Sequence, residues 1–103
     1  MNDKKSYVSS IVTEIQQVAE LFYQQQKASA FSRFAILLNS LSQASQLFYQ
    51  WKEAGDIKEF DDKQYLNVLV QAMNSLEAGD EVLLADILNY DLSDQIQNIL
   101  EQL

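Results

Sequence analysis

The chain has 103 residues, of which 48% are hydrophobic and 21% are charged, and its net charge is −8. A length of this size suits one domain, residues 1–103, with a single modest core. The absence of cysteine and histidine excludes disulfides, the commonest zinc sites and the usual Ser-His and Cys-His nucleophile pairs.

The first predicted helix covers residues 6–25. Proline is absent and glycine occurs only at Gly55 and Gly79, which favours helices because both residue types break them. Ser6 is the expected N-cap. Apolar residues recur in steps of three and four, which indicates one buried helix face: Val8, Ile11, Ile15, Val18 and Phe22. The polar stretch 24–29 then predicts a turn with Ser29 as the next cap, and one long helix across it is the alternative.

The second predicted helix covers residues 30–54 and carries two apolar rows. One row is Phe34, Leu38, Leu41, Ser45 and Phe48, and the other is Leu37, Leu41, Ala44, Phe48 and Trp51. Two rows make a wide stripe, so we expect this helix to be the most buried one. Gly55 ends it, since glycine adopts the left-handed conformation of a helix C-terminus at least cost.

The third predicted helix covers residues 62–77. Asp61 and Gln64 have the spacing of a capping box, in which each side chain satisfies an amide of the first turn. The expected core face of this helix is Leu66, Leu69, Val70, Met73 and Leu76. The helix is expected to end at Gly79.

The fourth predicted helix covers residues 80–102, with Asp80 as its cap. Its core stripe falls within about 120° of arc and consists of Leu84, Leu88, Leu92, Ile96, Ile99 and Leu103. A second apolar group, Leu83, Ile87 and Tyr90, lies on the far side, so this helix either threads the middle of the bundle or presents a binding surface. A break before Ser93 is an alternative to one helix. The sequence thus predicts an all-α, mostly antiparallel four-helix bundle.

The charge is unevenly distributed along the chain. Residues 1–52 carry five cations and three anions, whereas residues 53–103 carry two cations and twelve anions. Such a field repels phosphate backbones, so we expect no direct nucleic-acid binding and a partner that is helical or basic. An acidic regulator or nucleic-acid mimic that blocks a basic surface is the alternative. Because no apolar run approaches a membrane span, we expect no membrane association and a cytoplasmic location.

Acidic residues in the sequence do not have the spacing of a known metal or cofactor site. Counted from Asp56 as an EF-hand loop, position 3 is Lys58 and position 5 is Phe60, where oxygen ligands are required. A di-metal carboxylate bundle needs Glu-x-x-His pairs, and the chain has no histidine. The order Asp91-Leu92-Ser93-Asp94 is also wrong for a phosphopantetheine attachment site. We therefore expect no metal, no cofactor, no catalytic residue and no enzymatic activity.

Three resemblances bear on function. Trp51 and Gly55 in mid-chain, with Tyr90 and Asp94 in Tyr-x-x-x-Asp spacing, are similar to small secreted helical-hairpin proteins of the Trp-x-Gly type, although Trp51 is followed by Lys-Glu and Gly79 interrupts the second half. The number and size of the helices over the whole chain resemble flagellar and secretion export chaperones. The segment 82–92 resembles small uncharacterised bacterial helical bundles.

These observations favour a non-catalytic protein-binding module of chaperone or adaptor type. It would hold a helical segment of a partner or form a homodimer, through a hydrophobic groove or through the face of Leu83, Ile87 and Tyr90. Two Phe-Tyr pairs near helix C-termini add Tyr23 and Tyr49 to the candidate binding residues. Trp51 is the sixth candidate. In an antiparallel bundle the two pairs would lie at opposite ends.

Overall fold

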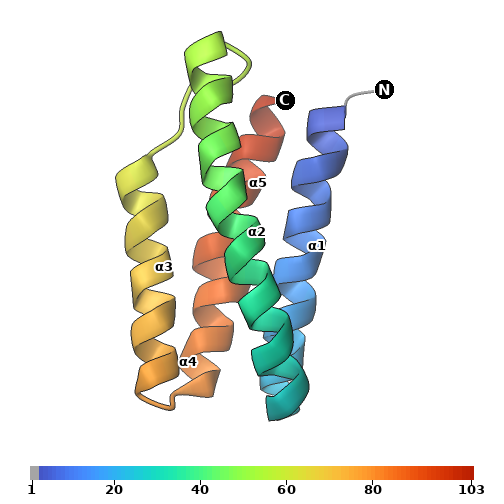
Figure 1. Ribbon diagram of the computed structural model, residues 1–103, viewed down its shortest axis with the longest axis vertical. Helices are drawn as coiled ribbons and strands as arrows, with labels where there is room; N and C mark the ends of the chain where they lie inside the picture. Colours follow the sequence, from blue (N-terminus) through green and yellow to red (C-terminus); the bar gives the residue numbers. More distant parts are fainter. Residues whose placement is uncertain (1–2) are drawn as a thin grey trace.

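The computed structural model describes residues 3–103, and within that range the chain folds as four helices without a strand. Helix α1 spans Asp3–Tyr23, α2 spans Lys27–Ala54 and α3 spans Asp62–Glu77. The last helix is continuous and has three sections, α4 (Glu81–Asp86), the π-helical turn η1 (Ile87–Leu92) and α5 (Ser93–Gln102). The helices run alternately up and down (Figure 1), which confirms the predicted all-α antiparallel bundle.

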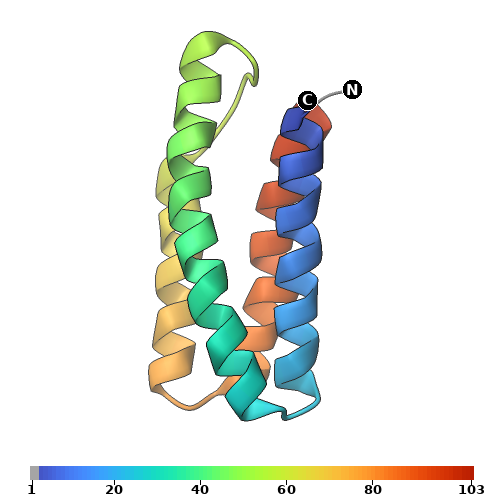
Figure 2. The same ribbon diagram turned by 45° about the vertical axis from the view of Figure 1, so that its right-hand side comes forward.

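The four helices are not packed equally closely around the bundle. Helix α1 packs against α2 on one side and against α4, η1 and α5 on the other, and α3 packs against α4 and η1. The backbones of α2 and α3 stay farther apart than those of these pairs. Figures 1 and 2 show that a loop joins α2 and α3 at one end of the bundle and that α2 extends beyond the start of α3. The bundle is therefore most open between α2 and α3.

The core rows predicted for the first two helices are largely confirmed. The whole predicted row of α1 is buried, and in α2 the buried side chains are Phe34, Leu37, Leu41, Ala44 and Phe48. Leu38, Ser45 and Trp51 are only half-buried. The core of α2 is thus narrower than the two rows predicted.

The core face predicted for α3 is wrong in part. Leu66, Val70 and Met73 are exposed, whereas Leu69 and Leu76 are half-buried and pack against the core. The buried side chains of α3 are instead Tyr65, Val68, Ala72 and Ser75. Small side chains such as Ala72 and Ser75 let α3 come close to α4 and η1, and the Ser75 hydroxyl donates a hydrogen bond to the Gln71 carbonyl at 2.9 Å. Close packing therefore outweighs the burial of the larger side chains.

The predicted helix caps have mixed outcomes. Ser6 and Ser29 lie inside α1 and α2 and cap neither helix. The turn between those helices is present but short, and Gln25 adopts a left-handed φ of 60° there. Asp61 and Asp80 do cap their helices, because their carboxylates accept hydrogen bonds from the amides of Gln64 and Leu83, both at 3.0 Å.

The π-helical turn explains how the last helix keeps its core stripe in line. Leu84, Leu88, Leu92 and Ile96 are spaced by four residues and are all fully buried. In an α-helix each step of four overshoots a full turn by about 40°, so three steps would drift by about 120°. The wider turn of a π-helix takes more residues, so it absorbs this drift. Ser93 is buried within the continuous helix, so no break occurs at the position considered.

The loop between α2 and α3 is held by Gln102, a residue of α5 that is distant in sequence. Gly55 adopts φ 83° as the C-cap of α2, as predicted. The side chain of Gln102 then pairs with the loop backbone: its Oε1 accepts from the amides of Lys58 and Glu59 at 2.8 and 2.9 Å, and its Nε2 donates to the Glu59 carbonyl at 2.9 Å. We call these three hydrogen bonds the Gln102 clamp.

Replacing Gln102 by alanine should loosen this loop without unfolding the bundle. Because the freed amides can bond to water, we expect the free energy of unfolding to fall by only about 1 kcal/mol. Amide hydrogen exchange at Lys58 and Glu59 should become faster. The exposed Gln16→Ala variant on α1 is the control, and equal exchange rates in the two variants would show that the clamp does not hold the loop.

Candidate functional site

A cleft lies along the open side of the bundle, between α2 and α3, and has a volume of about 610 Å³. We call it the groove. Helix α2 lines it with Leu38, Ser42, Ser45, Gln46, Tyr49 and Gln50. The loop and α3 line it with Phe60, Asp62, Tyr65, Leu66 and Leu69. Apolar and uncharged polar side chains therefore form almost the entire surface of the groove.

Three aromatic rings hold α2 and α3 apart at the loop end of the groove. The ring centroids of Phe48 and Phe60 are 5.5 Å apart, those of Phe60 and Tyr65 are also 5.5 Å apart, and those of Phe48 and Tyr65 are 6.3 Å apart. All three pairs are packed edge to face, a favourable arrangement for aromatic rings. We call these residues the aromatic wedge. Beside it, the small side chains of Ser42 and Ser45 on α2 leave the groove hollow.

A buried hydrogen bond ties the wedge to α2. The Tyr65 hydroxyl donates to the Leu41 carbonyl at 2.7 Å. Burial of this hydroxyl raises the pKa of Tyr65 well above its ordinary value of 10, with a smaller contribution from the charge of Tyr7. The hydroxyl is therefore protonated at neutral pH and serves to fix the distance between the two helices.

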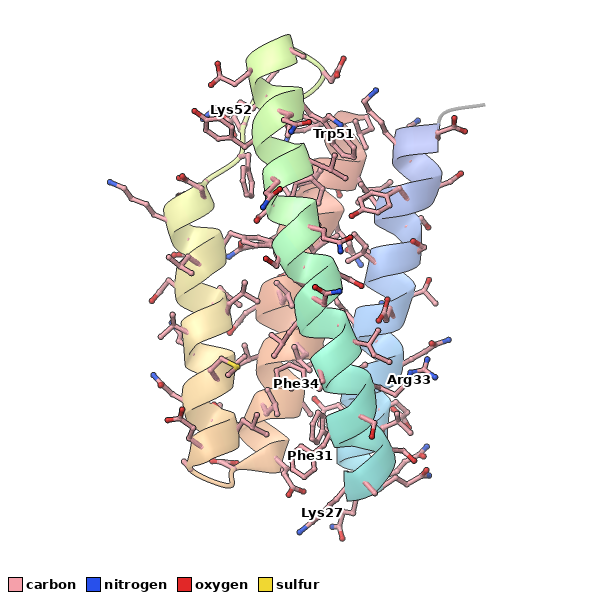
Figure 3. The ribbon with its side chains drawn as sticks, viewed as in Figure 1. Lys27, Phe31, Arg33, Phe34, Trp51 and Lys52 are labelled. Carbon is pink, nitrogen blue, oxygen red and sulfur yellow. The ribbon has the colours of Figure 1, made fainter. Side chains whose placement is uncertain are left out.

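The two helices that border the groove are free of charge over most of their length. No charged residue occurs in α2 between Arg33 and Lys52, or in α3 between Lys63 and Glu77. The Arg33 side chain lies on the side of α2 that faces α1 (Figure 3), where its guanidinium donates to the Gln17 side chain at 3.2 Å. Depletion of charge is typical of the centre of a protein interface, and here it occurs in a chain with a net charge of −8.

Apolar side chains of α3 form an exposed ridge beside the groove. Leu66, Val70 and Met73 are 61%, 46% and 37% exposed. Their spacing of four and three residues places them along one side of the helix. We call them the α3 ridge. The sequence pattern assigned these residues to the core, so apolar surface that we expected inside the bundle is instead exposed.

The acidic residues lie mainly elsewhere. On the other side of α3, Glu59, Asp61 and Asp94 contribute to a smaller cleft of about 310 Å³. Within residues 3–103, no three acidic residues come together so as to hold a metal ion. In the same part of the chain, none of the helices has the length and apolar character needed to cross a membrane.

The predicted face on the last helix is not continuous. Ile87 is buried, whereas Leu83 and Tyr90 are exposed. Helix α1 and helix α3 both pack against η1, and Ile87 is covered while Leu83 and Tyr90 stay in solvent. Two separate exposed side chains remain where we expected a face of three.

The other candidate residues have different surroundings. Tyr49 lines the groove. Tyr23, at the opposite end of the bundle, donates a hydrogen bond to the Asp86 carboxylate, and this bond, together with partial burial, raises the pKa of Tyr23 to about 12. Trp51 packs against Phe48 and Tyr7, with ring centroids 5.5 and 6.2 Å apart, and points toward α1 in Figure 3.

Of the six candidate residues, then, Tyr49 lines the groove and the other five lie outside it. Sequence reasoning missed the contributions of Phe60, Tyr65, Leu66 and Leu69. The uncharged segments 34–51 and 64–76 were a signal of this surface in the sequence, because charged residues are depleted at the centre of protein interfaces.

Replacing Tyr65 by phenylalanine tests the role of its hydroxyl. At neutral pH the loss of the bond to Leu41 should lower the free energy of unfolding by about 1 kcal/mol. Folding raises the pKa of Tyr65 above 10, the ordinary pKa of tyrosine. The contribution of its hydroxyl to the free energy of unfolding is therefore complete below pH 10 and is lost as the pH rises above that value. The stability of the variant should therefore fall less steeply above pH 10 in urea denaturation. Parallel curves for the two proteins would contradict this role.

Comparison with known families finds one that matches almost the entire chain. The family model described as "Domain of unknown function (DUF8042)" matches residues 1–102. The chain belongs to this family. Neither a curated protein nor a solved structure matches it.

Proposed function

We propose that this member of the DUF8042 family is a non-catalytic protein-binding module, of adaptor or chaperone type, which holds the apolar face of a helix in the groove between α2 and α3. The observation that carries the proposal is the groove itself. It is a cleft of about 610 Å³ with an apolar, almost uncharged lining, open along one side of a well-packed bundle.

The shape of the groove favours a helical occupant. It runs between two antiparallel helices (Figure 1), and a helix can lie along such a groove and insert side chains spaced by three and four residues. Leu38 and Leu69 are half-buried at its sides and offer apolar contacts. Ser42 and Gln46 can form hydrogen bonds at its rim. Burial of apolar surface would supply most of the binding free energy.

The lining offers little for catalysis. A general acid or base works best when its pKa lies near the operating pH. The Tyr65 hydroxyl has a raised pKa and is already bonded to Leu41. Asp62 lies in the first turn of α3, where a carboxylate stabilises the positive end of the helix dipole. Both groups thus have structural roles, which supports a binding function.

Site-specific photo-cross-linking tests this proposal. A photo-reactive amino acid at Gln46, which lines the groove, should give a covalent protein adduct in the cell that makes the chain. The same replacement at Gln43, an exposed position of α2 outside the groove lining, should give little. Adding Leu66→Asp should abolish the adduct at position 46, because a charge would enter an apolar contact.

A control variant separates loss of binding from loss of folding. Leu66 is 61% exposed and Ile36, on α2 and outside the groove lining, is 59% exposed. Either change to aspartate should alter the free energy of unfolding by no more than about 0.5 kcal/mol. Ile36→Asp should leave the adduct intact. Equal adduct yields from positions 46 and 43, or a yield that Leu66→Asp leaves unchanged, would contradict docking in the groove.

A further inference from the structure

We propose that the helix held in the groove is α3 of a second copy of the chain. Two copies would then form a two-fold symmetric dimer, in which the α3 ridge of each copy inserts into the groove of the other. This inference rests on the proposed function, because it names the occupant of the same groove.

The arrangement of the ridge and the groove supports a second copy. A two-fold interface brings the same surface of each partner together, so that surface must be complementary to itself. Here an exposed apolar ridge lies directly beside an apolar groove, and Leu66 belongs to both. A single helix from another protein would fill the groove but leave the outer side of the ridge in water. A second copy covers both.

The distribution of charge also favours this surface for contact between two copies. Each copy has a net charge of −8, so two copies repel one another through most surfaces. The groove lining and the α3 ridge contain Asp62 as their one charged residue, so contact through them brings few acidic residues of the two copies together. A basic partner would instead be attracted to the acidic cleft near Glu59, Asp61 and Asp94, on the other side of α3.

The available area is sufficient for a stable dimer. Such an interface buries roughly 800 Å² on each partner, about one eighth of the 6095 Å² that the chain exposes. The 16 residues of α3 extend over about 24 Å at 1.5 Å per residue. The molecule measures 40 × 28 × 19 Å, so an interface of this size would take most of the side formed by α2 and α3.

Sedimentation equilibrium of the purified full chain tests the inference directly. We expect a species of twice the 11.8 kDa chain mass. Added salt should preserve or strengthen it, because salt screens the repulsion between the acidic copies and does not weaken apolar contacts. Leu66→Asp should weaken dimerisation by at least about tenfold. The matched Ile36→Asp variant should dimerise like the wild type.

The two proposals can fail separately. A wild-type chain that stays monomeric at every concentration and salt level would overturn the dimer, as would a dimer that Leu66→Asp leaves intact. If the chain is monomeric but position 46 still cross-links to a different protein in a Leu66-dependent way, the groove remains a docking site and only the second copy is excluded. An adduct of twice the chain mass supports both proposals. If the chain is monomeric and gives no groove-dependent adduct, both proposals are overturned.

Discussion

The aromatic wedge of Phe48, Phe60 and Tyr65, with the hydrogen bond from Tyr65 to Leu41, sets the position of α3 relative to α2. On its other side α3 packs closely against α4 and η1 through small side chains. Helix α3 is therefore drawn toward the last helix and held away from α2. The width of the groove and the exposure of the α3 ridge both follow from these opposed contacts.

Much of the fold could be predicted from sequence because three of the four helices have one dominant apolar stripe. For α1 and for the last helix, the spacing of the apolar residues identified the buried side chains correctly. Helix α3 differs, because it is apolar on two sides and uncharged from Gln64 to Leu76. Periodicity alone does not decide which side faces inward. Contact with α4 and η1 decides it, and this contact depends on the small size of Ala72 and Ser75.

The candidate site was predicted less well, because it depends on how two helices are placed relative to one another. A groove is formed by residues from two helices, and its depth depends on the distance between them, which local sequence does not encode. On the last helix, the steps of four from Leu84 to Ile96 contained a visible drift, but the π-helical turn that absorbs it was not foreseen. Of the predicted face, Ile87 is buried, whereas Leu83 and Tyr90 stay exposed.

The Gln102 clamp has a consequence for the order in which the protein folds. Gln102 lies 43 residues after Glu59, whose backbone it holds, and contacts between such distant residues form only after a large loop has closed. During synthesis, α2 and α3 emerge before α5, so the loop between them is at first not held by Gln102. The loop end of the groove is completed only when α5 docks, so a later helix finishes the site that α2 and α3 form.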